Sequence, residues 1–196
     1  MRIKNTYYGT VNVNNLVLNE NEVAQRLMTE RGYTNDLIKK CEEVLRQNVK
    51  CRFSGARLDI TVSDNTIDTG FFKTESVSLA KNLRGCSEVF VLAITLGVEA
   101  DRLLTRLSAV SPAEHYITDA LASALAESLC DYAEMRVKGE NDCRPRFSVG
   151  YGDLSLDIQK DVLNLVSGEK LLGITLTESN LMIPQKSITA IIGINP

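Results

Sequence analysis

The sequence predicts an α+β fold with a twisted, mostly antiparallel sheet flanked by helices. Residues 89–95 are the most apolar run of the chain, and their β-branched side chains are typical of a buried central strand. Residues 112–137 open with a proline and repeat apolar side chains at helical spacing, which predicts one long helix. Shorter helical and alternating segments surround these two, without an internal repeat or a low-complexity linker.

Two helices are predicted in the first quarter of the chain. The first spans residues 19–31, with Asn19 or Asn21 as its N-cap, and a glycine follows its end. The second starts near residue 34 and runs to about residue 48, with apolar side chains three and four positions apart. Both are therefore expected to bury one face.

Alternating apolar and polar side chains predict strands at residues 49–53 and 56–62. Ser54–Gly55 is the expected turn between them, and Asp64–Asn65 the expected turn after them. A short helix is predicted over residues 75–83.

Four further elements complete the prediction around the long helix. A helix follows the central strand at about residues 98–107, and Ser155 is expected to cap another at about 156–166. Residues 173–177 and 188–194 have the composition of strands.

Composition excludes several classes of function. The chain has 196 residues, is 44% hydrophobic and 24% charged, and carries a net charge of −3, unlike a basic nucleic-acid binder. No apolar run approaches the roughly 20 residues of a membrane span. The first residues do not resemble a signal peptide, so we expect a cytoplasmic protein without nucleic-acid or membrane partners.

Metal and nucleotide motifs are also missing from the sequence. Five cysteines without a C-x-x-C pair do not indicate a disulfide scaffold, a zinc ribbon or an iron–sulfur site. His115 is the only histidine, and no metal site is predicted. A P-loop is absent, and Ser155 stands where the dinucleotide fingerprint beginning at Gly150 needs a glycine.

Two ordered motifs in the last third carry the functional prediction. The first is R-x-x-x-G-Y at residues 146–151. The second combines L-T-E-S at 176–179, M-x-P at 182–184 and S-I-T at 187–189. In this order and at this distance they resemble the activation domain of cobalamin-dependent methionine synthase. With the strand and long helix upstream, the resemblance covers roughly residues 88–196.

The resemblance implies a role in reductive reactivation. That domain binds S-adenosylmethionine (AdoMet) and remethylates the corrinoid after it has been oxidised. The chain is thus expected to serve a corrinoid-binding methionine synthase or related corrinoid methyltransferase, whose cobalt is reduced by flavodoxin or ferredoxin. It would be a free-standing module and not a complete methionine synthase. The expected division is a helical and β-hairpin portion at 1–87 and an AdoMet-binding portion at 88–196, packed as one compact domain.

The resemblance implies that six residues bind AdoMet and that no residue acts in acid–base catalysis. The fork of Arg146 can bind the carboxylate of AdoMet. Gly150, expected at positive φ or against the ligand, lets the backbone approach it. Tyr151 offers its ring to the adenine or the sulfonium and its hydroxyl as an anchor.

Glu127, Glu140 and Ser187 complete the predicted AdoMet site. The two acids fall where the family places carboxylates near the cofactor, and they could accept from the ammonium or the ribose. Each of these residues also has an ordinary alternative. Glu127 could be a solvated helix residue, Glu140 a solvated loop residue and Ser187 a strand residue.

The chain also departs from the family pattern. After Gly-Tyr the family usually has a short Pro/Cys/Pro segment and a histidine, whereas this chain has Gly152–Asp153. The family also continues, beyond the position of Pro196, with an aromatic segment that contacts AdoMet. The alternative function is a non-catalytic clamp or regulator of a corrinoid protein that no longer binds AdoMet. A small-molecule sensor or assembly factor on the same fold is a third hypothesis.

Overall fold

The centre of the fold is β6 (Glu88–Thr95), a strand that is buried on both faces. The structure is a computed structural model that describes residues 3–28 and 36–195. Successive side chains of a strand point to opposite faces, so an unbroken apolar run supplies two cores. The first core contains Phe90, Leu92 and Ile94, and the second contains Val89, Val91 and Ala93.

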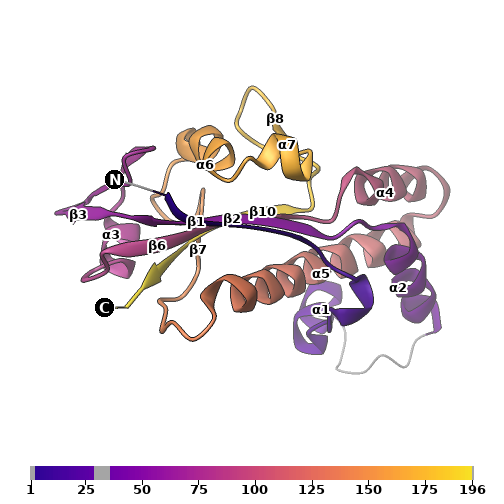
Figure 1. Cartoon of the computed structure of the whole chain (residues 1–196). Helices are drawn as coiled ribbons and strands as arrows, with labels where there is room; N and C mark the ends of the chain where they lie inside the picture. The colour runs from indigo at the N-terminus through magenta and orange to yellow at the C-terminus, as the bar shows by residue number, and fades with distance from the viewer. Residues whose placement is uncertain (1–2, 29–35, 196) are drawn as a thin grey trace.

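β6 lies in the middle of a five-stranded antiparallel sheet in the order β1-β2-β6-β10-β7. Figure 1 shows the sheet edge-on, with helices above and below it. The predicted fold class and central strand are thereby confirmed. The other strands are β1 (Ile3–Thr10), β2 (Arg52–Asp59), β7 (Phe147–Ser148) and β10 (Ser187–Ile194).

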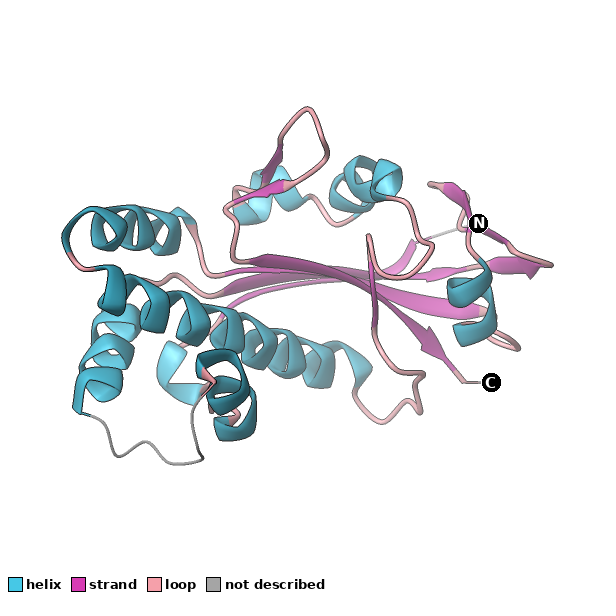
Figure 2. Cartoon of the chain, turned by 180° about the vertical axis from the view of Figure 1, so that it is seen from behind, coloured by secondary structure: helices cyan, strands magenta, loops and turns pink. Residues whose placement is uncertain are grey.

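Four helices form the first core with one face of the sheet. The long α5 (Pro112–Lys138) runs along this face and packs against β2, β6 and β10, as Figure 2 shows from behind. The other three are α1 (Glu20–Leu27), α2 (Asp36–Asn48) and α4 (Val98–Val110).

The capping prediction for α1 is confirmed for Asn19. Its side chain accepts hydrogen bonds from the backbone N–H groups of Asn21 and Glu22. The predicted ends of the first two helices at residues 29–31 and 34–35 lie outside the described residues.

The second core lies under shorter helices on the opposite face. These are α3 (Val77–Asn82), the 3-10 helix η2 (Leu156–Ile158), α6 (Gln159–Leu165) and α7 (Gly168–Leu172). Ser155 accepts a hydrogen bond from the Asp157 N–H, which confirms it as a cap. The remaining elements are η1 (Val13–Asn15), β3 (Thr61–Ser63), β4 (Thr66–Asp68), β5 (Lys73–Glu75), β8 (Thr175–Leu176) and β9 (Met182–Ile183).

The predicted turn at Ser54–Gly55 is wrong, because both residues lie inside β2. Gly55 pairs with Tyr7 of β1 and Leu92 of β6. A Cβ at Gly55 would lie 3.0 Å from the Val91 carbonyl oxygen, so the glycine serves a close approach instead of a turn. The turn predicted at Asp64–Asn65 does connect β3 and β4.

The sheet takes β1 and β2 from residues 1–87 and its other three strands from residues 88–196. The division of the chain at residue 87 stays a prediction. No helix within residues 3–28 and 36–195 is both long and apolar enough to cross a membrane.

We expect Gly55→Val to lower the free energy of unfolding by about 1–3 kcal/mol, because the new side chain would press on Val91 and Leu92. Urea denaturation measures the change. Thr10→Val, at an exposed position of β1, is the control and should change stability little. Equal stability of the two variants would contradict the packing seen around Gly55.

Candidate functional site

Arg146 lies directly before β7 and points its guanidinium at α5. Nη1 contacts Asp131 Oδ1 at 2.6 Å and Glu134 Oε2 at 3.0 Å, and Nη2 contacts Glu127 Oε2 at 3.0 Å. The three acids lie four and three positions apart on α5, which places them on one helix face. The structure therefore brings together two predicted site residues, Arg146 and Glu127.

This cluster is partly sheltered and carries net negative charge. Only 21% of the Arg146 side chain is exposed, against 38% for Glu127 and 68% for Asp131. Cys130 lies next to Asp131 on the helix, and burial raises the pKa of its thiol to about 12, although Arg146 opposes the shift. Since that thiol stays neutral, three carboxylates outweigh one guanidinium.

The turn after β7 presents Gly150 and Tyr151. Gly150 has φ +84°, which confirms the expected left-handed conformation, and a Cβ there would lie 2.8 Å from Leu156 Cδ2. Tyr151 is 69% exposed, and its ring packs edge-to-face with that of Phe147 at a centroid distance of 5.5 Å. The tyrosine ring is thus held at its base and has surface free for a ligand.

Asp153 anchors this turn to α3, a role that the sequence did not indicate. Its carboxylate accepts from the Ser76 hydroxyl at 2.7 Å and from the N–H groups of Val77 (2.7 Å) and Ser78 (3.2 Å). These hydrogen bonds, led by that of Ser76, lower the pKa of Asp153 to about 2. The partners are more than 70 residues away in sequence, so no local spacing could have signalled them.

Glu140 and Ser187 are not joined to the cluster. Glu140 is exposed in the turn after α5, and its side chain forms no hydrogen bond or ion pair with the described residues. The Ser187 hydroxyl is buried at the start of β10, where it bonds Thr95 Oγ1 at 2.9 Å and the Pro184 carbonyl at 2.8 Å. Their roles in binding stay predictions.

Comparison with solved structures finds a close match in architecture. A crystal structure of the MetH reactivation domain bound to AdoHcy superposes with a TM-score of 0.75, over 98% of this chain and 79% of that chain. The chain has the fold of the MetH reactivation domain. Sequence identity over the match is 16%, so the likeness concerns the fold. No protein-family model matches the chain, and neither does any curated protein.

The reactivation-domain fold extends beyond the segment in which the sequence motifs were found. A match over 98% of the chain takes in nearly all of residues 1–87, where no sequence resemblance is visible. In this fold, the turn carrying Gly150 and Tyr151 is anchored by Asp153 to Ser76 and its neighbours in that earlier segment.

We expect Asp153→Asn to destabilise the chain at neutral pH, because the carboxylate is lost from the N-terminus of α3. The folded pKa of about 2 lies below the ordinary 3.8, so this stabilisation is complete above pH 3.8 and is lost as the pH falls through about 2. Urea midpoints at a series of pH values measure it.

Wild type and Asp153→Asn should therefore converge in stability at the lowest pH values. Asp64→Asn, in the exposed turn between β3 and β4, is the matched control and should keep the wild-type pH profile. A constant difference between wild type and Asp153→Asn at all pH values would contradict the role of the carboxylate charge.

Proposed function

We propose that the chain binds AdoMet at the Arg146 cluster and the adjoining Gly150–Tyr151 turn. The observation that supports this most is the contact of 3.0 Å between Arg146 Nη2 and Glu127 Oε2, beside a tyrosine ring with free surface. The shared fold with the MetH reactivation domain, whose crystal structure holds AdoHcy, supports the same proposal.

The Arg146–Glu127 pair offers one opposite charge to each charged group at the amino-acid end of AdoMet. That end carries a carboxylate, which a guanidinium binds well, and an ammonium, which a carboxylate accepts. A ligand that enters between Arg146 and Glu127 replaces one internal ion pair by two intermolecular ones. Asp131 and Glu134 both contact Nη1, so they can hold the arginine in place while Nη2 changes partner.

The net charge of the cluster also suits AdoMet. With an ammonium, a sulfonium and one carboxylate, AdoMet is a net cation, whereas AdoHcy lacks the sulfonium charge. Three carboxylates around one guanidinium attract the cation more than the neutral product. The exposed face of Tyr151 adds a surface on which a sulfonium or an adenine can lie.

We infer that the bound AdoMet donates its methyl group to a corrinoid on a partner protein. The corrinoid, reduced to cobalt(I) by flavodoxin or ferredoxin, would attack the methyl carbon while the sulfonium leaves as a thioether. The chain would supply position and electrostatics, because transfer of a methyl group from a sulfonium to cobalt(I) needs no proton transfer. The partner remains a proposal drawn from the resemblance.

One observation favours the alternative, a corrinoid-protein clamp that does not bind AdoMet. Arg146 is already neutralised by Glu127, Asp131 and Glu134, and it ties the segment before β7 to α5. Such a network can be purely structural. Direct binding measurements separate the two proposals.

We expect AdoMet to bind the wild-type chain and Arg146→Ala to weaken binding at least about tenfold, or ~1.4 kcal/mol. Arg146→Lys keeps the charge but loses the fork, so it should also weaken binding. Glu127→Gln removes the negative charge that would pair with the ammonium and should act in the same direction. Isothermal titration calorimetry measures all four proteins.

Arg106→Ala, at an exposed arginine on α4, is the control and should bind like wild type. AdoMet should also bind more tightly than AdoHcy, and Asp131→Asn should reduce that preference. Absence of heat with millimolar AdoMet would reject the site and favour the clamp. Equal binding by wild type and Arg146→Ala would reject the role of Arg146.

We expect methyl transfer to need four components: this chain, a cobalt(II) corrinoid protein, a reduced flavodoxin or ferredoxin, and AdoMet. The visible spectrum of the corrinoid reports methyl–cobalt formation. Arg146→Ala should slow the reaction and Arg106→Ala should not. Remethylation at the same rate without the chain would exclude the reactivation function.

A further inference from the structure

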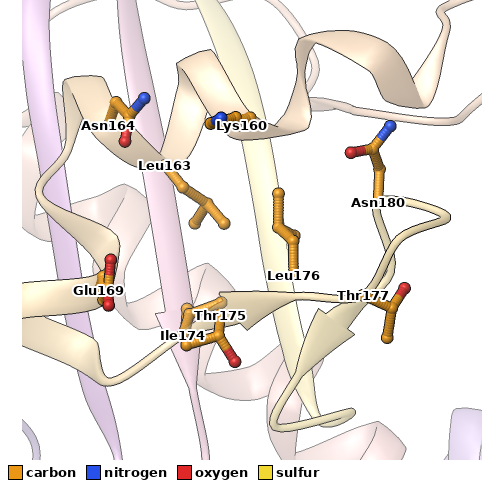
Figure 3. Close-up of a pocket in the computed structure, with 9 residues that line it drawn as sticks. All are labelled: Lys160, Leu163, Asn164, Glu169, Ile174, Thr175, Leu176, Thr177 and Asn180. Carbon is orange, nitrogen blue, oxygen red and sulfur yellow. The ribbon is translucent and has the colours of Figure 1, made fainter.

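A pocket of about 420 Å³ lies between α6, α7 and the β8–β9 hairpin. This volume falls within the range of roughly 300–1,000 Å³ that small-molecule sites occupy. Figure 3 shows Leu163 pointing into the hollow between α6 and β8, with Lys160 and Asn164 on the helix above. The lining combines apolar Leu163, Ile174 and Leu176 with polar Lys160, Asn164, Glu169, Thr175, Thr177 and Asn180.

Four polar side chains around this pocket have no hydrogen-bond or ion-pair partner among residues 3–28 and 36–195. Lys160, Asn164, Glu169 and Asn180 line it, yet their side chains form no hydrogen bond or ion pair with the residues described in the structure. Lys160 and Glu169 carry opposite charges but do not pair with each other. In contrast, Lys186, which lies directly before β10, contacts Asp119 of α5 at 2.8 Å.

The backbone of β8 adds a free donor and acceptor. Thr175 pairs with Ile183, and the Thr177 N–H donates to the Leu181 carbonyl at 2.9 Å, so alternate residues of this strand point at β9. Leu176 lies between them, and its N–H and C=O therefore point away from β9. Because β8 is two residues long, this edge can serve one amino-acid unit but cannot extend into a peptide strand.

We propose that this pocket binds a small α-amino acid with an apolar side chain. Lys160 and the Leu176 N–H would meet the carboxylate, and Glu169 would meet the ammonium. Leu163 and Ile174, which are buried, form the apolar floor on which the ligand side chain would lie. The two unpaired charges and the apolar floor together fit a zwitterion better than an anion or a neutral molecule.

The pocket is separate from the proposed AdoMet site. α6, α7 and β8 cover one face of the sheet, whereas Arg146 contacts α5 on the other face (Figure 1). Binding of an amino acid here therefore does not depend on the proposed function. Failure of AdoMet binding would leave this proposal standing, and the reverse also holds.

L-leucine is the probe, and the methyl resonances of Leu163, Ile174 and Leu176 are the readout. NMR titration of the methyl-labelled full chain with unlabelled leucine should shift these resonances. Leucine methyl ester lacks the carboxylate charge and N-acetyl-leucine lacks the ammonium, so each should bind more weakly. The expected loss is about two- to fivefold, the range for an ion pair open to solvent.

Two variants test which side chain binds the carboxylate of the ligand and which binds its ammonium. Lys160→Met should prefer leucine over its methyl ester less than wild type does, and Glu169→Gln should prefer leucine over N-acetyl-leucine less than wild type does. Lys39→Met, at an exposed position of α2, and Arg146→Ala should both keep wild-type leucine binding. Unshifted methyl resonances at millimolar leucine would overturn the proposal. It would also be overturned if Lys160→Met and Glu169→Gln preferred leucine over its two derivatives as strongly as wild type does.

Discussion

The burial of β6 on both faces is the constraint on which the rest of the structure depends. A strand with apolar side chains on both faces cannot leave either face in water, so the chain has to supply helices on both sides. α5 covers one face, and α3, α6 and α7 cover the other, in two separate cores. Because α5 crosses beneath β10, its acidic face lies where the chain enters β7. The position of the candidate site is therefore a consequence of the layers.

The Arg146 cluster shows how stability and binding can share the same residues. A partly buried guanidinium needs partners, and the three acids of α5 need a cation, since like charges on one helix face repel. A ligand that simply displaced Arg146 Nη2 from Glu127 would leave that carboxylate and Nη2 without an ionic partner. A zwitterion avoids this cost because it brings a new partner for each, which makes exchange of partners the physically favourable route.

The sequence predicted the elements whose pattern is strong. β6, β10 and α5 combine continuous or periodic apolar side chains, and the Asn19 cap and positive φ of Gly150 follow from local chemistry. β1 was not predicted, because an edge strand with mostly exposed side chains lacks an apolar pattern. Ser54 and Gly55 at the centre of β2 are small residues of the kind found in turns. In the strand their small size leaves room for the neighbouring backbone of β6.

The contacts of the candidate site could be predicted only in part. The resemblance named Arg146 and Glu127, but not that they pair with each other or that Asp131 and Glu134 share the guanidinium. These partners lie 12 to 19 residues away across a loop, where spacing carries no information about contact. The pocket beside β8 is formed by groups from two helices and a hairpin, so it exists only after the chain has folded.

Long-range anchors hold parts of this fold together in a chain that shares 16% identity with the matched reactivation domain. In the turn after β7, Asp153 accepts hydrogen bonds from Ser76 and Val77 and thereby fixes the turn. Arg52 of β2 likewise donates to the carbonyl groups at the end of α7, at 2.7 Å for Leu172. Both anchors connect the last third of the chain to its first half. The geometry of the turn and of the helical layer thus depends on long-range contacts, which a local motif can neither show nor replace.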